Sequence, residues 1–235
     1  MGERAQRPWV IVHNAVSADG RIDHLTVDVE LYYEMMSRWE IDVHLTGSET
    51  ILAAGDEVSG GEVPDDETPD NETPENTPSG DDAAGPLLVV PDSRGRIRHW
   101  HLLKAMLYWR GVLSLCSQTT PPEHLAYLNQ HGIEYLIVGE ERVDLRAALE
   151  ILYARYGART VLVDSGGTLN GALFRAGLVD EVSLLVHPAL VGGTSPKSIY
   201  RAPDLDSDEG VIPLRLTHVE RMRGDVVSLR WEIER

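Results

Sequence analysis

The sequence predicts one α/β domain in which helices flank a mainly parallel central sheet that ends in an antiparallel hairpin. Short apolar runs of strand length alternate with segments of helical periodicity along the chain. This alternation favours parallel strands joined by crossover helices. The last two apolar runs are separated only by a turn at Arg223-Gly224-Asp225, which favours an antiparallel pair. We expect this single domain to span residues 1–235.

The expected strands are rich in Val, Ile and Leu and are bounded by Gly, Pro, Asp or Ser. The first is WVIVHNAVS, residues 9–17. His13 and Asn14 interrupt its apolar run and no small-residue cleavage site follows, so we expect a buried strand rather than a signal peptide. The other expected strands are 42–47, 87–93, 111–117, 133–139, 161–165, 181–188, 214–221 and 226–234.

Helices are expected where apolar side chains recur at helical spacing beside a capping residue or a proline. In VELYYEMMSRW, residues 29–39, the Met and aromatic side chains form a stripe that is typical of the core. The expected helices are 29–39, 48–55, one that begins at Pro121-Pro122, one that Asp144 caps, and 166–177.

An acidic segment interrupts this pattern at residues 55–85. It holds 11 acidic residues and no Lys or Arg, and it has few large apolar side chains, so we expect a disordered insert. The formal net charge of −17 argues against a nucleic-acid or anionic-membrane partner. The single cysteine, Cys116, lies in an expected strand and excludes an intrachain disulfide, which fits a cytoplasmic protein with a buried thiol.

Three expected strand ends combine Gly with Ser or Thr, and ligands bind beyond the carboxyl ends of parallel strands. At 165–168 (SGGT), two residues without Cβ open a helix whose first N–H groups are unpaired, so the joint is either a phosphate cradle or a plain turn. At 17–21 (SADGR), Asp19 and Arg21 are candidate substrate contacts, or part of an Asp-Gly turn. The segment 46–50 (TGSET) has the same placement.

These motifs resemble the reductase domain of riboflavin biosynthesis, the C-terminal domain of the bifunctional deaminase-reductase, which has the dihydrofolate-reductase-like fold. The similarity spans nearly the whole chain apart from the acidic segment. The block from 161 to 193 is the most specific part, with G-L-[VI]-D-E at 177–181 and Gly192-Gly193. The family patterns are S-x-D-G-[KR] at Ser17, Asp19, Gly20 and Arg21; G-x-x-T-[VI]-L at Gly47, Thr50, Ile51 and Leu52; and [ED]-x-G-G/P-T-L at Asp164, Gly166, Gly167, Thr168 and Leu169.

The resemblance implies an NADPH-dependent reductase that acts on a small-molecule substrate, a phosphoribosylaminopyrimidine, by hydride transfer to the ribosyl C1, with no metal. It implies that Asp164 reaches the substrate and that Asp19 and Arg21 line the space near the nicotinamide. It also implies that the chain pairs as a homodimer. The cofactor-binding residues that it implies are Ala15, Gly47, Thr50, Ser93, Ser165, Gly166, Gly167, Thr168 and Leu169.

The chain departs from the family at one informative place. After G-x-x-T-[VI]-L the family continues with D-D-P-x-L-T-x-R, whose arginine helps to bind the substrate phosphate, whereas here Ala53-Ala54-Gly55 leads into the acidic segment. Two alternatives therefore stay open. One is a reductase of another pterin-like, carbonyl or imine compound, and the other is a nicotinamide-nucleotide-binding protein without turnover.

Some residues are candidates by position alone. Arg94 and Arg96 follow Ser93 and are candidates for reading the cofactor 2′-phosphate, because the arginine fork suits phosphate. His24, Asp28 and His187 lie near expected strand ends, where each is either a cleft residue or an ordinary loop, cap or edge residue.

Overall fold

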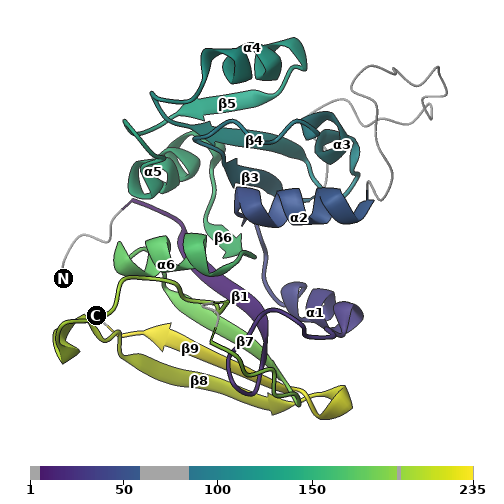
Figure 1. Cartoon of the computed structure of the whole chain (residues 1–235), viewed down its shortest axis with the longest axis vertical. Helices are drawn as coiled ribbons and strands as arrows, with labels where there is room; N and C mark the ends of the chain where they lie inside the picture. Colours follow the sequence, from purple (N-terminus) through teal and green to yellow (C-terminus); the bar gives the residue numbers. More distant parts are fainter. Residues whose placement is uncertain (1–5, 59–84, 195–196, 235) are drawn as a thin grey trace.

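The fold is built on one nine-stranded sheet (Figure 1), seen here in a computed structural model that describes residues 6–58, 85–194 and 197–234. The strand order is β5-β4-β3-β2-β6-β1-β7-β9-β8. Neighbours are parallel as far as β7, whereas β9 pairs antiparallel with both β7 and β8. The predicted α/β class with an antiparallel C-terminal hairpin is confirmed. The strands are β1 (Trp9–Ser17), β2 (Val43–Leu45), β3 (Leu87–Pro91), β4 (Gly111–Cys116), β5 (Glu134–Ile137), β6 (Thr160–Val163), β7 (Glu181–His187), β8 (Leu214–Arg221) and β9 (Val227–Ile233).

Helices cover both faces of the sheet (Figure 1). On one face, Val10 and Val12 of β1 belong to a core that includes Leu149 of α5 and Leu173 of α6. The opposite face packs against α1 through α4, and Ile11 of β1 lies there. Strands buried on both faces need apolar residues at nearly every position, which is why β3 and β6 read as continuous apolar runs. The helices are α1 (Val29–Met36), α2 (Ser48–Val58), α3 (Trp100–Ala105), α4 (Pro122–Gln130), α5 (Leu145–Tyr156) and α6 (Gly167–Arg175).

The predicted helix signals are confirmed at two starts. The Asp144 carboxylate accepts hydrogen bonds from the N–H groups of Arg146 and Ala147, at 3.0 and 3.1 Å, and so caps α5. α4 begins at Pro122, where the missing N–H costs nothing. α3 was not predicted, because its six residues bury only Trp100 and Leu103 and are too few to show a periodicity.

β6 ends before its neighbour β1 does, and this leaves a notch beside β1 at the carboxyl edge of the sheet. Its last residue, Val163, pairs with Val12 of β1. β1 continues beyond that point, paired with β7 as far as Ser17. The chain that leaves β6 therefore turns beside the last residues of β1, at the edge where parallel sheets bind ligands.

The acidic insert predicted for residues 55–85 lies almost entirely outside the described residues. Residues 55–58 are described, and they continue α2 beyond the predicted end of that helix. Within the described ranges, none of the helices is long and apolar enough to cross a membrane. Cys116 is buried in β4, and burial raises the pKa of its thiol.

Candidate active site

The joint between β6 and α6 is tied to the end of β2. The Thr46 hydroxyl donates a hydrogen bond to the main-chain oxygen of Asp164. The N–H of Gly47 donates to the Ser165 hydroxyl at 3.1 Å. A Cβ on Gly47 would lie 2.7 Å from Ser165 Oγ and 3.7 Å from Leu169 Cβ, so only glycine fits here without a shift. Four predicted site residues, Gly47, Asp164, Ser165 and Leu169, thus meet in one place.

Two buried amides tie the same joint to β1. Asn14 Nδ2 donates to the main-chain oxygen of Ser165 at 2.9 Å. Asn170 Nδ2 donates to Asn14 Oδ1 at 2.9 Å and to the same Ser165 oxygen at 3.1 Å. Ala15, a predicted cofactor residue, follows Asn14 and is half-buried on the α1 side of the sheet. The amides fix the position of the joint relative to β1, and no pattern in the sequence indicates that they pair.

The two glycines of the joint do different things. At Gly166 an added Cβ would meet nothing within 4 Å, and the residue precedes α6 without a side-chain cap. At Gly167 a Cβ would overlap the main-chain oxygen of Ser198, and at Gly171 it would overlap that of Arg201. Gly167 and Gly171 therefore make room for the chain crossing α6. Gly166 leaves the helix start accessible to an anionic group, as a dinucleotide phosphate requires. Thr168, in the first turn, is exposed.

Asp19 holds the turn after β1 against the segment that follows β7. Its carboxylate accepts hydrogen bonds from the Ser17 hydroxyl at 2.6 Å and from the N–H groups of Val191 and Gly192 at 3.1 and 2.7 Å. The Ser17 bond is the largest cause, and together these bonds lower the pKa of Asp19 to about 2. Asp19 is thus an ionised acceptor near neutral pH, which disfavours it as a proton donor.

Arg21 is buried and, like Asp19, holds the turn after β1 against the segment that follows β7. Its guanidinium binds the Asp23 carboxylate, with Nη2 3.0 Å from Oδ1, and donates to the main-chain oxygens of Gly192 and Lys197 at 2.6 and 3.0 Å. A β-bridge joins Arg21 to Ser198. Because Ser198 also lies against Gly167, the 197–201 segment links the β1 turn to the start of α6.

The remaining cofactor candidates lie at the ends of β2 and β3. Thr50 is half-buried in the first turn of α2, and its N–H donates to the Gly47 oxygen at 3.0 Å. Ser93 Oγ accepts from the N–H of Val143 at 3.1 Å. Arg96 contacts Ser48 and the Glu49 carboxylate, at 3.0 and 2.8 Å.

The positional candidates around α1 have ordinary structural roles. Asp28 caps α1, with its carboxylate accepting from the N–H of Leu31 at 2.9 Å, and it pairs with Arg223. His187 uses both ring nitrogens: Nδ1 lies 3.1 Å from the Leu185 oxygen, and Nε2 lies 3.4 Å from the N–H of Asp28. His24 is a loop residue whose side chain is 81% exposed.

Sequence reasoning missed three side chains that surround Asp164. They are His13 of β1, Tyr32 of α1 and His44 of β2. Tyr32 was interpreted as a core residue, which its burial confirms, but its hydroxyl faces Asp164. Two histidines inside otherwise apolar strands were the available signal. Within the described residues, no group of three or more His, Cys, Asp or Glu side chains is arranged to hold a metal ion.

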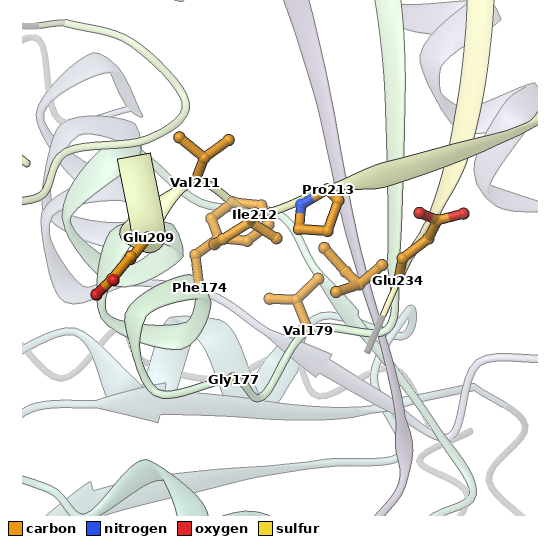
Figure 2. A pocket seen from close by; sticks show the side chains of 10 residues that line it. Phe174, Gly177, Val179, Glu209, Val211, Ile212, Pro213 and Glu234 are labelled. Atoms are coloured by element: carbon orange, nitrogen blue, oxygen red, sulfur yellow. The ribbon is translucent and has the colours of Figure 1, made fainter. Parts of the chain in front are cut away.

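A cavity of about 330 Å³ lies at the other end of α6, away from this joint. Figure 2 shows Phe174, Val179, Ile212 and Pro213 among the side chains that line it. None of the predicted site residues lines it. We place the candidate site at the β6–α6 joint, because that is where the polar groups and the open helix start converge.

Comparison with known proteins relates almost the whole chain to one family. The RibD C-terminal domain family matches residues 8–228. The chain is 29% identical over 230 residues to the 2,5-diamino-6-ribosylamino-4(3H)-pyrimidinone 5′-phosphate reductase of Methanothermobacter thermautotrophicus, covering 94% of this chain and 96% of that protein. Proteins with the same name from Archaeoglobus fulgidus and Aquifex aeolicus are 28% and 27% identical, over 96% and 97% of this chain and 99% and 97% of theirs.

Solved structures share the fold. A pyrimidine reductase-like protein from Corynebacterium diphtheriae has a TM-score of 0.70 at 13% identity, with 97% of this chain and 92% of that chain covered. The riboflavin biosynthesis reductase of Saccharomyces cerevisiae has a TM-score of 0.63 at 17% identity, with 100% and 93% covered. RibD of Acinetobacter baumannii has a TM-score of 0.66 at 21% identity; 98% of this chain is covered, but it spans only 59% of that longer chain.

Proposed function

The chain belongs to the RibD C-terminal domain family, and we propose that it is a reductase of riboflavin biosynthesis that converts the ribosyl group of a phosphoribosylaminopyrimidine into a ribityl chain. Three relatives that align over nearly their full length carry the name of such a reductase. The observation in this chain that carries the proposal is the β6–α6 joint. There, the partly exposed Asp164 carboxylate stands two residues before the open helix start at Gly166.

NADPH is the proposed cofactor, and when bound it supplies the hydride for the sugar carbon. Within the described ranges no side chain caps the start of α6, and its first N–H groups suit the pyrophosphate, because a helix N-terminus attracts anions. Gly166 permits close approach there, and the exposed Thr168 offers a hydroxyl. Gly47, Thr50 and Ser93, at the ends of β2 and β3, extend the proposed cofactor site across the sheet edge. Ala15 and Leu169 complete its apolar wall.

In this proposal the protein orients the substrate and controls the proton. Reduction at C1 breaks the bond between C1 and the ring oxygen, and that oxygen takes up one proton. Asp164 is proposed to face the substrate. Asp19 and Arg21 fix the β1 turn near the nicotinamide, because their side chains are committed to the segment 191–198.

The direct test is the oxidation of NADPH with diamino-ribosylaminopyrimidinone phosphate and with its deaminated form, at low and high salt. Saturable turnover of either supports the proposal. NADPH binding without turnover would contradict this substrate assignment and favour a pterin-like, carbonyl or imine substrate. One observation keeps this alternative open. The D-D-P-x-L-T-x-R run is absent, and α2 continues to Val58 in its place. Binding without turnover across a pyrimidine and pterin panel would favour a non-catalytic nucleotide-binding protein.

Arg94 is expected to set the preference for NADPH over NADH. It is exposed and, in the described part of the chain, has no hydrogen-bond or ion-pair partner, whereas Arg96 is occupied by Ser48 and Glu49. Replacing Arg94 by Ala should reduce the ratio of NADPH to NADH affinity by about 10- to 100-fold, since a charge-assisted contact to phosphate contributes about 1.5–3 kcal/mol.

The matched control is Arg155→Ala, an exposed arginine on α5 that contacts the Tyr156 ring. Equilibrium titration of both cofactors against both variants measures the ratio. An unchanged ratio in Arg94→Ala would remove Arg94 from the proposal.

A homodimer is proposed on a specific surface, the outer apolar face of β7, β9 and β8. These strands carry apolar side chains on the same side of the sheet at successive paired positions. Leu214, Leu216 and Val219 are 43%, 52% and 57% exposed. At its paired positions this face carries one charged side chain, Arg221 opposite Val227 at the end of β8, so a second copy can cover the apolar positions without desolvating further ions. Its members are Leu184, Val186, Val227, Leu229, Trp231, Leu214, Leu216 and Val219.

The double substitution Leu216→Glu with Val219→Glu should convert this dimer into a monomer in sedimentation velocity, because each new carboxylate would be buried between copies. Leu102→Glu is the control, since Leu102 of α3 is 48% exposed on another part of the surface. A wild-type monomer at working salt would contradict the proposal. A cytoplasmic location is also proposed, on the ground of the single buried cysteine.

A further inference from the structure

Four polar side chains from four elements meet under α1. His13 comes from β1, Tyr32 from α1, His44 from β2 and Asp164 from the end of β6. They lie together because β6 is inserted between β1 and β2 in the sheet, so that residues distant in the sequence share one face.

His44 and Asp164 are direct neighbours. His44 Nε2 lies 3.7 Å from Asp164 Oδ2. The Tyr32 hydroxyl lies 3.0 Å from the main-chain oxygen of His13 and also faces the Asp164 carboxylate. The carboxylate is therefore held between an imidazole on one strand and a phenol on the helix above it.

The cluster meets solvent through its carboxylate. The Asp164 side chain is 35% exposed and that of His44 only 7%, while His13 is fully buried. Any proton that passes between this cluster and a substrate in the notch therefore passes through Asp164. This limits the direct contact with substrate to one of the four groups.

Two of the buried members, His13 and Tyr32, are held in one protonation state near neutral pH. Burial is the main cause that lowers the pKa of His13 to about 4, and the nearby Arg230 and His44 act in the same direction. Burial, and then the Asp164 charge, raise the pKa of Tyr32 well above its usual range. His13 is therefore neutral and Tyr32 protonated, which leaves the contact between His44 and Asp164 as the place in this cluster where a proton can be exchanged.

His44 also lacks the bonding of a purely structural histidine. Among the described residues its Nδ1 has no hydrogen-bond partner. The other close neighbour of the ring is Trp109, which is uncharged and packs edge-on at 5.1 Å; Tyr108 packs in turn on Trp109. By contrast, His187 binds main-chain groups through both nitrogens. The polar contact of His44 is thus the one to Asp164.

We propose that His44 and Asp164 share one exchangeable proton and deliver it to the substrate, with Asp164 in contact with the substrate and His44 as the positioning residue. The inference rests on the proposed reductase function. In the step, the hydride forms a C–H bond at C1 and the bond from C1 to the ring oxygen breaks with its electron pair on oxygen. That oxygen takes the proton from Asp164. The pair then regains one proton from water, so each turnover consumes one hydride and one proton.

The test compares His44→Phe, which keeps a ring against Trp109, with His44→Gln, whose amide can still donate to Asp164. Neither side chain can take up and return a proton as an imidazole does, so the Asp164 carboxyl group is left without a basic partner. We expect kcat at pH 7 to fall by about 10- to 100-fold in both variants. In the pH profile of kcat, the range in which kcat falls as the pH rises should move to lower pH. Acidification should therefore partly restore the activity of the variants.

Two further readouts separate positioning from damage to the fold. The affinity for NADPH should stay within about threefold of wild type in both variants, and His44→Gln should keep the wild-type KM better than His44→Phe, because it retains the donor. His124→Gln is the matched control. It removes a buried imidazole that lies 3.5 Å from the Asp92 carboxylate, and it should lower stability while leaving the pH profile of kcat in place.

The outcomes distinguish this inference from the proposed function. If wild type turns over a pyrimidine substrate and His44→Phe has the same kcat and pH profile, the inference is overturned while the function stands. If wild type turns over neither pyrimidine, the proposed function fails. The pair is then tested by the ¹⁵N signals of the His44 ring nitrogens, which should shift in Asp164→Asn. Signals that do not respond to Asp164→Asn overturn the inference as well.

Discussion

Replacing Asp164 by Asn is expected to lower kcat for the pyrimidine substrate by about 10²- to 10⁴-fold, the range of a lost general acid. The change should not disturb the joint, because Thr46 and Leu45 bind the main chain of Asp164 rather than its carboxylate. The affinity for NADPH should therefore stay within about threefold of wild type. Stopped-flow measurement of NADPH oxidation, combined with a cofactor titration, separates the two effects.

The control for this prediction is Asp206→Asn, an exposed carboxylate outside the site that should keep wild-type kcat. Asp19 gives an informative comparison. Its low pKa, caused chiefly by the Ser17 hydroxyl, makes it an acceptor that positions a turn. If Asp164→Asn keeps the wild-type kcat, the proton comes from water and Asp164 has no part in the proposed proton delivery.

Gly171→Ala is expected to lower the free energy of unfolding by about 2–3 kcal/mol, because overpacking a site closed by main-chain atoms forces the backbone to move. A Cβ at this position would overlap the carbonyl oxygen of Arg201, which cannot rotate away as a side chain can. Chemical denaturation measures the loss.

Gly166→Ala is the matched variant, and its expected result is the opposite. The residue has a φ of −75° and open space around its Cβ position. Its stability should stay within about 0.5 kcal/mol of wild type, while NADPH affinity falls because the methyl group enters the proposed phosphate site. Equal destabilisation of the two variants would contradict the division of roles between these glycines. Unchanged NADPH affinity in Gly166→Ala would place the phosphates elsewhere.

The cluster around Asp164 gives the candidate site a feature that its motifs do not contain. The motifs supply the carboxylate, the glycines and the threonines, all of which lie in loops at the sheet edge. His13 and His44 come from inside the strands, and Tyr32 from the buried face of α1. If the proton pathway is as proposed, the sheet interior contributes to the chemistry as well as to stability.

The sequence alone determined the features that depend on neighbouring residues. Apolar runs predicted the strands of the described residues. For the central strands this is because burial on both faces demands apolar residues whatever the strand order is, and for the last two it is because a turn separates two such runs. The caps at Asp144 and Pro122 were readable because their hydrogen bonding is local. The glycine pair after β6 was readable as a joint, but its two members could not be told apart.

The tertiary structure decided what depends on residues distant in the chain. Gly167 and Gly171 differ from Gly166 only because the 197–201 segment crosses α6. The main-chain groups of Val191 and Gly192 that Asp19 and Arg21 bind lie 172 and 171 residues away from them, and His44 meets Asp164 only because β6 is inserted beside β2. Periodicity records which side of an element is buried. It does not record which other element covers that side, and both the candidate site and the outer apolar face depend on that.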